Sequence, residues 1–182
     1  MELTRLQEMQ NHYETAFESK PTACTFNKGP VQDFPEDFCV FEVPPCSKRD
    51  VWIYATCGMS FTDSDEIETF LLSPRQAPEL VELLYIFAHF HLTGERLDAG
   101  HTVNFGRPWL AGSSCDHGLL STMDGAKVER ATIDEKEVHF LWLIPITEAE
   151  RDYKIKFGLE ALDELFVEKE VDCADALRAS SV

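Results

Sequence analysis

Residues 138–144 are apolar at almost every position and rich in β-branched and aromatic side chains. A central strand that is buried on both faces has this composition, because each of its side chains has apolar neighbours. Proline cannot donate to a sheet ladder, so the pattern predicts that the strand ends at Pro145. His139 lies within the run, and we expect its ring to be buried with its hydrogen-bonding groups satisfied.

The apolar spacing becomes helical directly after this strand. Thr147 is a good N-cap residue, and Glu150, three residues later, completes a capping box. Apolar side chains then recur at helical spacing as far as Phe166. Gly158 interrupts the pattern at a cost of about 1 kcal/mol relative to alanine, so a kink or a restart is expected there. These features predict a helix that packs back on the sheet.

Five other elements follow from the spacing of apolar and polar positions. The pattern predicts an amphipathic helix at about 4–19, strands at 38–43, 50–56 and 66–72, and a helix at 79–91. The last of these is apolar nearly all round, as a helix buried on most sides would be.

The remaining segments are less regular. We expect residues 127–133 to form a strand that pairs with 138–144 across a turn. Three segments are expected to be mostly irregular: a loop with at most a short strand at 22–35, loops with one or two short strands at 95–125, and a polar tail with some order at 171–182. Long loops are often functional, which directs attention to 95–125.

Strands and helices are mixed along the chain without alternating strictly. This order favours an α+β fold, with a mixed or antiparallel β-sheet and helices packed on it, over a doubly wound parallel sheet. No repeat and no linker composition divides the chain, so we expect a single domain over residues 1–182.

The formal net charge is −17, and the acidic residues are spread over the whole chain. Such a surface repels nucleic acid and anionic membranes but attracts a basic protein. No stretch approaches the ~20 apolar residues of a transmembrane helix, and the N-terminus lacks the apolar segment of a signal peptide. We therefore expect a cytoplasmic protein. The acidic run at 63–66 is expected to be a solvated loop.

Cysteine and histidine patterns do not support a catalytic, metal or cofactor site. The six cysteines include no CxxC pair, and we expect free thiols because no secretion signal is visible. His89 and His91 would point about 200° apart on a helix. Cys115 and His117 are too few ligands for a tetrahedral metal site. Nucleophile-elbow, phosphate-loop and dinucleotide motifs are absent from the sequence.

Several motifs resemble those of the Suppressor of Fused domain family. They are YATCGMS at 54–60, the strand at 67–74, GHT at 100–102, LWLIPITEAE followed by GLEALDELF at 141–166, and DALRAS at 175–180. The resemblance implies an α/β sandwich-like domain with no known catalytic residues. Gly58 and Pro145, which are signature positions, are expected to serve folding.

The resemblance also suggests a function. Animal members of the family are two-part adaptors that hold a transcription factor of Hedgehog signalling, but this chain lacks the second part, so that partner does not carry over. Single-domain bacterial members are regarded as immunity proteins that neutralise polymorphic toxins, and this sequence is similar to those in size.

We therefore expect a non-enzymatic protein-binding domain, of the immunity type, whose partner is a protein, with a basic toxin domain as the candidate. The alternatives are an enzyme of unrecognised type and a regulatory adaptor subunit. Perturbed carboxylates or histidines in a deep pocket would favour the enzyme, whereas a shallow acidic groove or a free sheet edge would favour the binder. The candidate partner-binding residues are Asp98, His101, Trp109, Asp116 and Asp124.

Overall fold

The structure, a computed structural model, describes residues 3–62 and 66–182, so most of the acidic run at 63–66 lies outside the described residues. Its helices are α1 (Arg5–Phe17), α2 (Glu79–Thr93), α3 (Glu148–Phe157) and α4 (Leu159–Glu168), with short 3₁₀ turns η1 (Val31–Asp33) and η2 (Met59–Phe61). Its strands are β1 (Thr22–Cys24), β2 (Cys39–Val43), β3 (Trp52–Cys57), β4 (Ile67–Ser73), β5 (Thr102–Asn104), β6 (His117–Ser121), β7 (Arg130–Ile133) and β8 (Lys136–Ile146).

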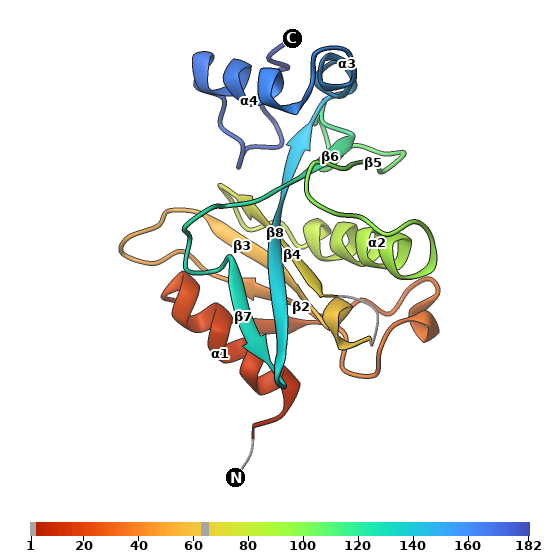
Figure 1. The fold of residues 1–182 in the computed structure, drawn as a ribbon, viewed down its shortest axis with the longest axis vertical. Coiled ribbons are helices and arrows are strands. Elements are labelled where there is room, and N and C mark those ends of the chain that lie inside the picture. The colour runs from red at the N-terminus through yellow and green to blue at the C-terminus, as the bar shows by residue number, and fades with distance from the viewer. Residues whose placement is uncertain (1–2, 63–65) are drawn as a thin grey trace.

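The strands form one mixed sheet in the order β1-β2-β3-β4-β8-β6-β5, and β7 pairs with the first residues of β8. β4 and β8 run parallel, and the other pairs are antiparallel. Figure 1 shows β8 running through the middle of the molecule, from β7 and α1 at one end to α3 and α4 at the other. The predicted α+β class, the central strand and the hairpin of β7 with β8 are all confirmed.

The prediction that Pro145 ends this strand is wrong, because β8 continues through Pro145 to Ile146. Pro145 lies opposite Gly118 of β6, but its carbonyl accepts a hydrogen bond from Arg178 Nη2 at 2.8 Å. In an antiparallel strand the nitrogen and the carbonyl of one residue point to the same side. The missing N–H therefore faces away from β6, and the ladder loses no hydrogen bond.

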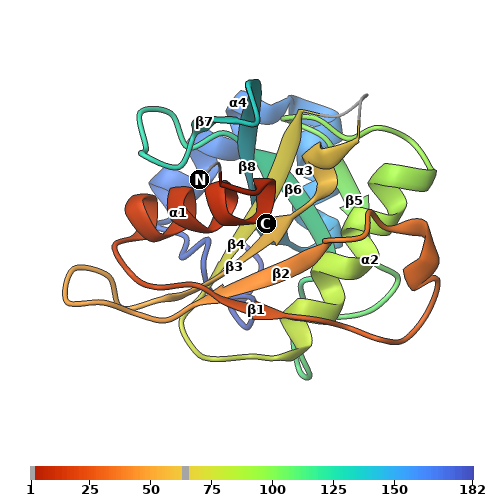
Figure 2. The same ribbon diagram turned by 90° about the horizontal axis from the view of Figure 1, so that it is seen from below.

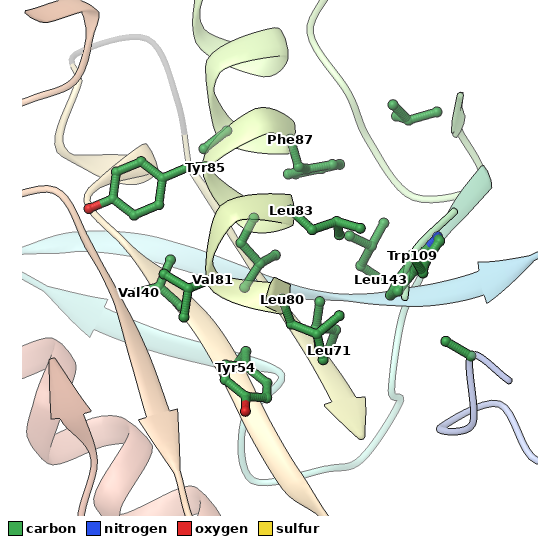
Figure 3. Close-up of a cluster of buried hydrophobic side chains, with 14 of the residues drawn as sticks. Val40, Tyr54, Leu71, Leu80, Val81, Leu83, Tyr85, Phe87, Trp109 and Leu143 are labelled. Atoms are coloured by element: carbon green, nitrogen blue, oxygen red, sulfur yellow. The ribbon is translucent and has the colours of Figure 1, made fainter. Parts of the chain in front are cut away.

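Helices cover both faces of the sheet (Figure 2). Figure 3 shows α2 laying Leu80, Leu83 and Phe87 over one face, where they belong to the same apolar cluster as Tyr54 and Leu143. On the other face α1 contributes Met9 and Tyr13 to a second cluster, and α4 contributes Leu162 and Phe166 to a third. The apolar helix predicted at 79–91 is thus buried on most sides, as expected.

The predicted breaks between helices are also confirmed. Thr147 and Glu150 form the expected capping box at the start of α3. Gly158 separates α3 from α4 with φ 97°, a left-handed conformation that glycine adopts without steric cost. α1 begins with a capping box as well, between Thr4 and Gln7.

The YATCGMS motif folds around the buried side chain of Glu68. One carboxylate oxygen accepts from the Thr56 hydroxyl at 2.7 Å, and the other accepts from the Gly58 N–H at 2.9 Å, the Ser60 N–H at 3.0 Å and the Ser60 hydroxyl at 2.7 Å. Gly58 has φ 117°, and a Cβ there would lie 3.1 Å from the Cα of Phe38. The motif therefore needs glycine at position 58 for its backbone conformation. Its polar groups donate the hydrogen bonds that the buried Glu68 carboxylate accepts.

The second signature surrounds Glu150, which is also buried. Arg178 donates to both carboxylate oxygens, at 2.6 and 2.8 Å, and Ser181 donates its N–H and its hydroxyl at 2.8 Å. Burial favours a higher pKa for Glu150, but the Arg178 guanidinium and the donors of Thr147 and Ser181 hold the pKa below its ordinary value. This cluster fixes the C-terminal tail against α3.

All six cysteines lie in the described part of the chain and are free. Burial raises the pKa of the Cys115 and Cys173 thiols to about 11, which disfavours the reactive thiolate. Titration of the denatured protein without reductant is expected to count close to six thiols, and the native protein should react more slowly. A count near zero would contradict both the structure and a reducing location.

Candidate protein-binding groove

An open groove of about 740 Å³ lies beside the end of α2. The first residues of β4 and the middle of β8 line it. It is lined by Glu66, Ile67, His91, Arg96, Leu97, Asp98, Ala99, His101, Thr122, His139 and Leu141. These residues come from two strands, one helix and three connecting segments. The sheet pairing brings the strand residues together, because Ile67 and His139 lie side by side in the parallel β4–β8 pair.

The groove changes the assignment of His139. Its ring is not buried as predicted: the side chain is 36% exposed, and Nε2 lies 3.1 Å from a Glu137 carboxylate oxygen. Leu141, two residues on, is buried in the cluster under α2. His139 opens into the groove because it precedes the part of β8 that α2 covers.

Residues 96–99 form one side of the groove, the groove wall. Leu97 is buried and anchors the wall in the core. Its N–H donates to Nδ1 of His91 at 3.0 Å, and the N–H of Asp98 donates to Nδ1 of His101 at 3.2 Å. The Asp98 carboxylate accepts the N–H of Ala99 at 2.7 Å, which keeps it at the exposed rim.

The lining of the groove combines polar and apolar residues and is mixed in charge. Glu66 and Asp98 are acidic, Arg96 is basic, and three histidines are present. Within residues 3–62 and 66–182, no three metal-ligating side chains are grouped so that they could hold an ion. An open surface of this size and mixed lining suits a segment of another protein better than a small apolar ligand, for which pockets are usually enclosed and predominantly apolar.

The structure separates the five predicted contact residues. Asp98 and His101 line the groove. Asp124 is exposed on the loop that follows Thr122, outside the lining. Trp109 is 1% exposed and donates its indole N–H to the His117 carbonyl at 2.8 Å, so its side chain is part of the core.

Asp116 is half-buried beside a histidine, an arrangement that bears on the enzyme alternative. Asp116 Oδ1 lies 2.7 Å from Nδ1 of His117, and Arg151 Nη1 lies 3.3 Å from its Nε2. The His117 side chain is 2% exposed. With both ring nitrogens engaged and the ring buried, His117 is poorly placed to act as a base on a bound substrate.

Four ionisable residues of the groove were not among the predicted contact residues: Glu66, His91, Arg96 and His139. His91 was hidden in an apolar helix, and Glu66 and His139 meet only through the parallel pairing of distant strands. One signal in the sequence could have identified them: the predicted strand at 66–72 and the predicted helix at 79–91 each have a polar residue at one end. Polar residues at the ends of strands and helices often border a binding site.

Fold and groove together define an α+β domain built on a mixed sheet, with an open groove at the meeting point of its two parallel strands. The chain belongs to the Suppressor of fused family: the sequence profile described as Suppressor of fused protein (SUFU) matches residues 35–179. No curated protein sequence matches the chain. None of the helices in the described residues combines the length and apolar character needed to cross a bilayer.

Solved structures agree with this assignment. The crystal structure of a SUFU homologue from Neisseria gonorrhoeae FA 1090 has 32% sequence identity and a TM-score of 0.80, over 98% of this chain and 94% of that chain. A chain of the Sufu–Fu complex shares the fold at 12% identity, with a TM-score of 0.73 over 98% and 92%. Drosophila Suppressor of Fused, at 13% identity and a TM-score of 0.69, is matched over 97% of this chain but 51% of its own.

Proposed function

We propose that this protein is a non-catalytic protein-binding domain of the immunity type, which neutralises a toxin by docking a basic domain in the groove. The observation that carries the proposal is the groove itself, which is large, open, mixed in polarity and bordered by Glu66 and Asp98. A relative of the same fold occurs in a complex between two proteins, Sufu and Fu, which supports protein binding as the mode of action.

The charge of the chain supports a basic partner. A net charge of −17 on 182 residues produces a long-range negative field. Toxins that act on nucleic acid are basic because they hold phosphates, so an acidic inhibitor can imitate the field of the substrate. Electrostatic complementarity of this kind mainly raises the association rate and the specificity.

The first experiment is co-expression with the product of the adjacent reading frame. The proposal expects a basic, toxin-like protein whose toxicity this chain suppresses, and a stable complex after purification. An acidic product, or a toxin that remains active in the presence of this chain, would contradict it. Activity of the chain alone on small substrates would instead support the enzyme alternative.

A matched pair of substitutions tests the groove. Asp98→Asn removes a charge at the rim of the groove but keeps the oxygen that accepts the Ala99 N–H. Glu14→Gln is the control, because it removes one charge from an exposed position on α1, on the other face of the sheet. We expect Asp98→Asn to lower the association rate in stopped-flow mixing by a factor of about 2–5, and Glu14→Gln to lower it less. The wild-type rate should fall as salt shortens the Debye length from about 10 Å at 0.1 M to about 3 Å at 1 M.

Equal effects of the two substitutions would exclude the groove as the docking face. A wild-type rate that stays constant with salt would leave the charge as a solubility feature. Unfolding of both variants by denaturant should match the wild type, since neither side chain contributes to the core.

A further inference from the structure

Two of the hydrogen bonds that hold the groove wall are of an unusual kind; a third joins the His101 N–H to the Asp98 carbonyl at 3.0 Å. Two consecutive backbone amides, those of Leu97 and Asp98, each donate to the Nδ1 atom of a histidine. His91 is buried in the last turn of α2, and His101 is exposed just before β5. The same two histidines therefore line the groove and fix the position of its wall.

Both hydrogen bonds require neutral histidine. A neutral imidazole whose Nδ1 accepts a hydrogen bond carries its proton on Nε2, whereas an imidazolium carries protons on both nitrogens and accepts from neither. Protonation would place an Nδ1–H against a backbone N–H. Histidine is the side chain whose unperturbed change of charge falls between about pH 5 and 8.

We propose that residues 96–99 form a pH-sensitive groove wall, which protonation of His91 and His101 releases, weakening the binding of a partner. The binding part of this inference rests on the proposed function. The release of the wall does not, because it concerns the free protein.

Other contacts confine the movement to the wall. Gly100 donates its N–H to the Leu120 carbonyl at 2.7 Å, and Leu120 donates its N–H to the His101 carbonyl at 2.9 Å. These bonds join backbone groups that do not titrate, so the start of β5 stays in place. At the other end the Gly94 N–H donates to the Phe90 carbonyl at 2.9 Å, which fixes the end of α2.

Charged groups on several elements face the two histidines. Among the described residues, the charged or titratable groups that line the groove with them are Glu66 before β4, His139 of β8, and Arg96 and Asp98 of the wall. The other side of the wall is bordered by Glu95, which follows α2, and by Lys154 of α3. The acids favour imidazolium, and the cations oppose it. His139 differs from the other two, because its Nε2 pairs with Glu137, so protonation strengthens its contact.

The test is amide hydrogen exchange of the free, full-length protein at pH 7.5 and pH 5.5, with rates corrected for intrinsic exchange. In the wild type, the protection factors of Leu97 and Asp98 are expected to fall about tenfold at pH 5.5, the worth of one hydrogen bond. The amides of Gly100 and Leu120 should keep their protection. Unchanged protection of Leu97 and Asp98 would overturn the inference and leave the proposed function standing.

Asparagine supplies the decisive variant, because its side-chain oxygen lies close to the position of histidine Nδ1 and does not titrate. His101→Asn is expected to keep the Asp98 amide protected at both pH values, whereas His101→Ala should lose that protection at both. His139→Asn is the control, since it removes a groove histidine that does not hold the wall. If His101→Asn still loses protection at pH 5.5, titration of His101 is not the cause.

Partner affinity separates the two proposals. Where the wall opens at pH 5.5, the dissociation constant of the wild-type complex should rise about tenfold, and the His101→Asn complex should change less. An open wall with unchanged affinity would overturn the link to binding and remove the groove as the docking site. The absence of any complex at pH 7.5 would contradict the proposed function. The hydrogen-exchange result would still decide whether the groove wall opens at low pH.

Discussion

Replacing Arg178 with methionine is expected to lower the free energy of unfolding at pH 7 by about 3–5 kcal/mol, because it leaves the Glu150 carboxylate buried without its cation. The Arg178 side chain is 8% exposed and donates to both oxygens of Glu150, which is fully buried. Urea unfolding followed by tryptophan fluorescence measures the loss. Arg130→Met is the control: Arg130 is 58% exposed, and surface ion pairs contribute about 0–1 kcal/mol.

The pH dependence of this loss has a definite sign. In the wild type the Glu150 pKa is held below 4.5, so its contribution is present above that pH and is lost as the pH falls through the folded-state pKa. Without Arg178, burial raises the pKa of the same carboxyl, and protonation relieves the buried charge. The difference between wild type and Arg178→Met should therefore shrink from pH 7 to pH 4.5. A loss below about 1 kcal/mol, or one that grows in acid, would refute the role assigned to the pair.

Glu68→Ala should cost about 3 kcal/mol or more, or prevent folding, since it leaves the Ser60 hydroxyl and the N–H groups of Gly58 and Ser60 without their acceptor. Each orphaned buried group costs about 1–3 kcal/mol, whereas the Thr56 hydroxyl can still donate to the Thr69 carbonyl, 3.2 Å away. Glu68→Gln keeps an accepting oxygen and should lose much less stability. The ratio of folded to unfolded protein in urea at pH 7 gives both values, and equal losses in the two variants would show that the hydrogen bonds are not the cause.

The Glu68→Gln variant also has a pH signature. Burial raises the pKa of Glu68 above 4.5, in spite of its hydrogen bonds. A raised carboxyl pKa means that the folded state binds the proton more tightly than the unfolded state does. This group therefore stabilises the folded protein at low pH, and that contribution is lost as the pH rises through the folded-state pKa. The slope is opposite to that of Glu150. Glu68→Gln should therefore abolish the Glu68 contribution and, with it, this slope.

The sequence was sufficient where the determinants of structure are local. The capping box of Thr147 and Glu150, the break at Gly158 and the apolar strand at 138–144 each depend on residues a few positions apart, and each was predicted. Pro145 was misjudged because its effect depends on which neighbouring strand its nitrogen faces. That direction is set by the distant strand β6 and by Arg178, neither of which local spacing reveals.

The same distinction holds for buried polar groups and for the groove. Glu68 alternates with apolar residues like an exposed strand residue, and only the turn formed by the YATCGMS motif supplies its partners. Asp98 and His101 were found because they lie in an irregular polar loop. His139 was misplaced because its exposure depends on where α2 ends over the sheet, which is a property of packing.

The parallel pairing of β4 with β8 has a consequence for synthesis of the chain. β1 to β4 form an antiparallel meander in sequence order, so they can associate as they leave the ribosome. The pairing partner of β4 does not exist until residue 136 and beyond have been made. Until then the nascent sheet has an unpaired apolar edge at β4, which is the kind of edge that recruits other chains. Premature termination before β8 should therefore yield an aggregating fragment rather than a smaller folded domain.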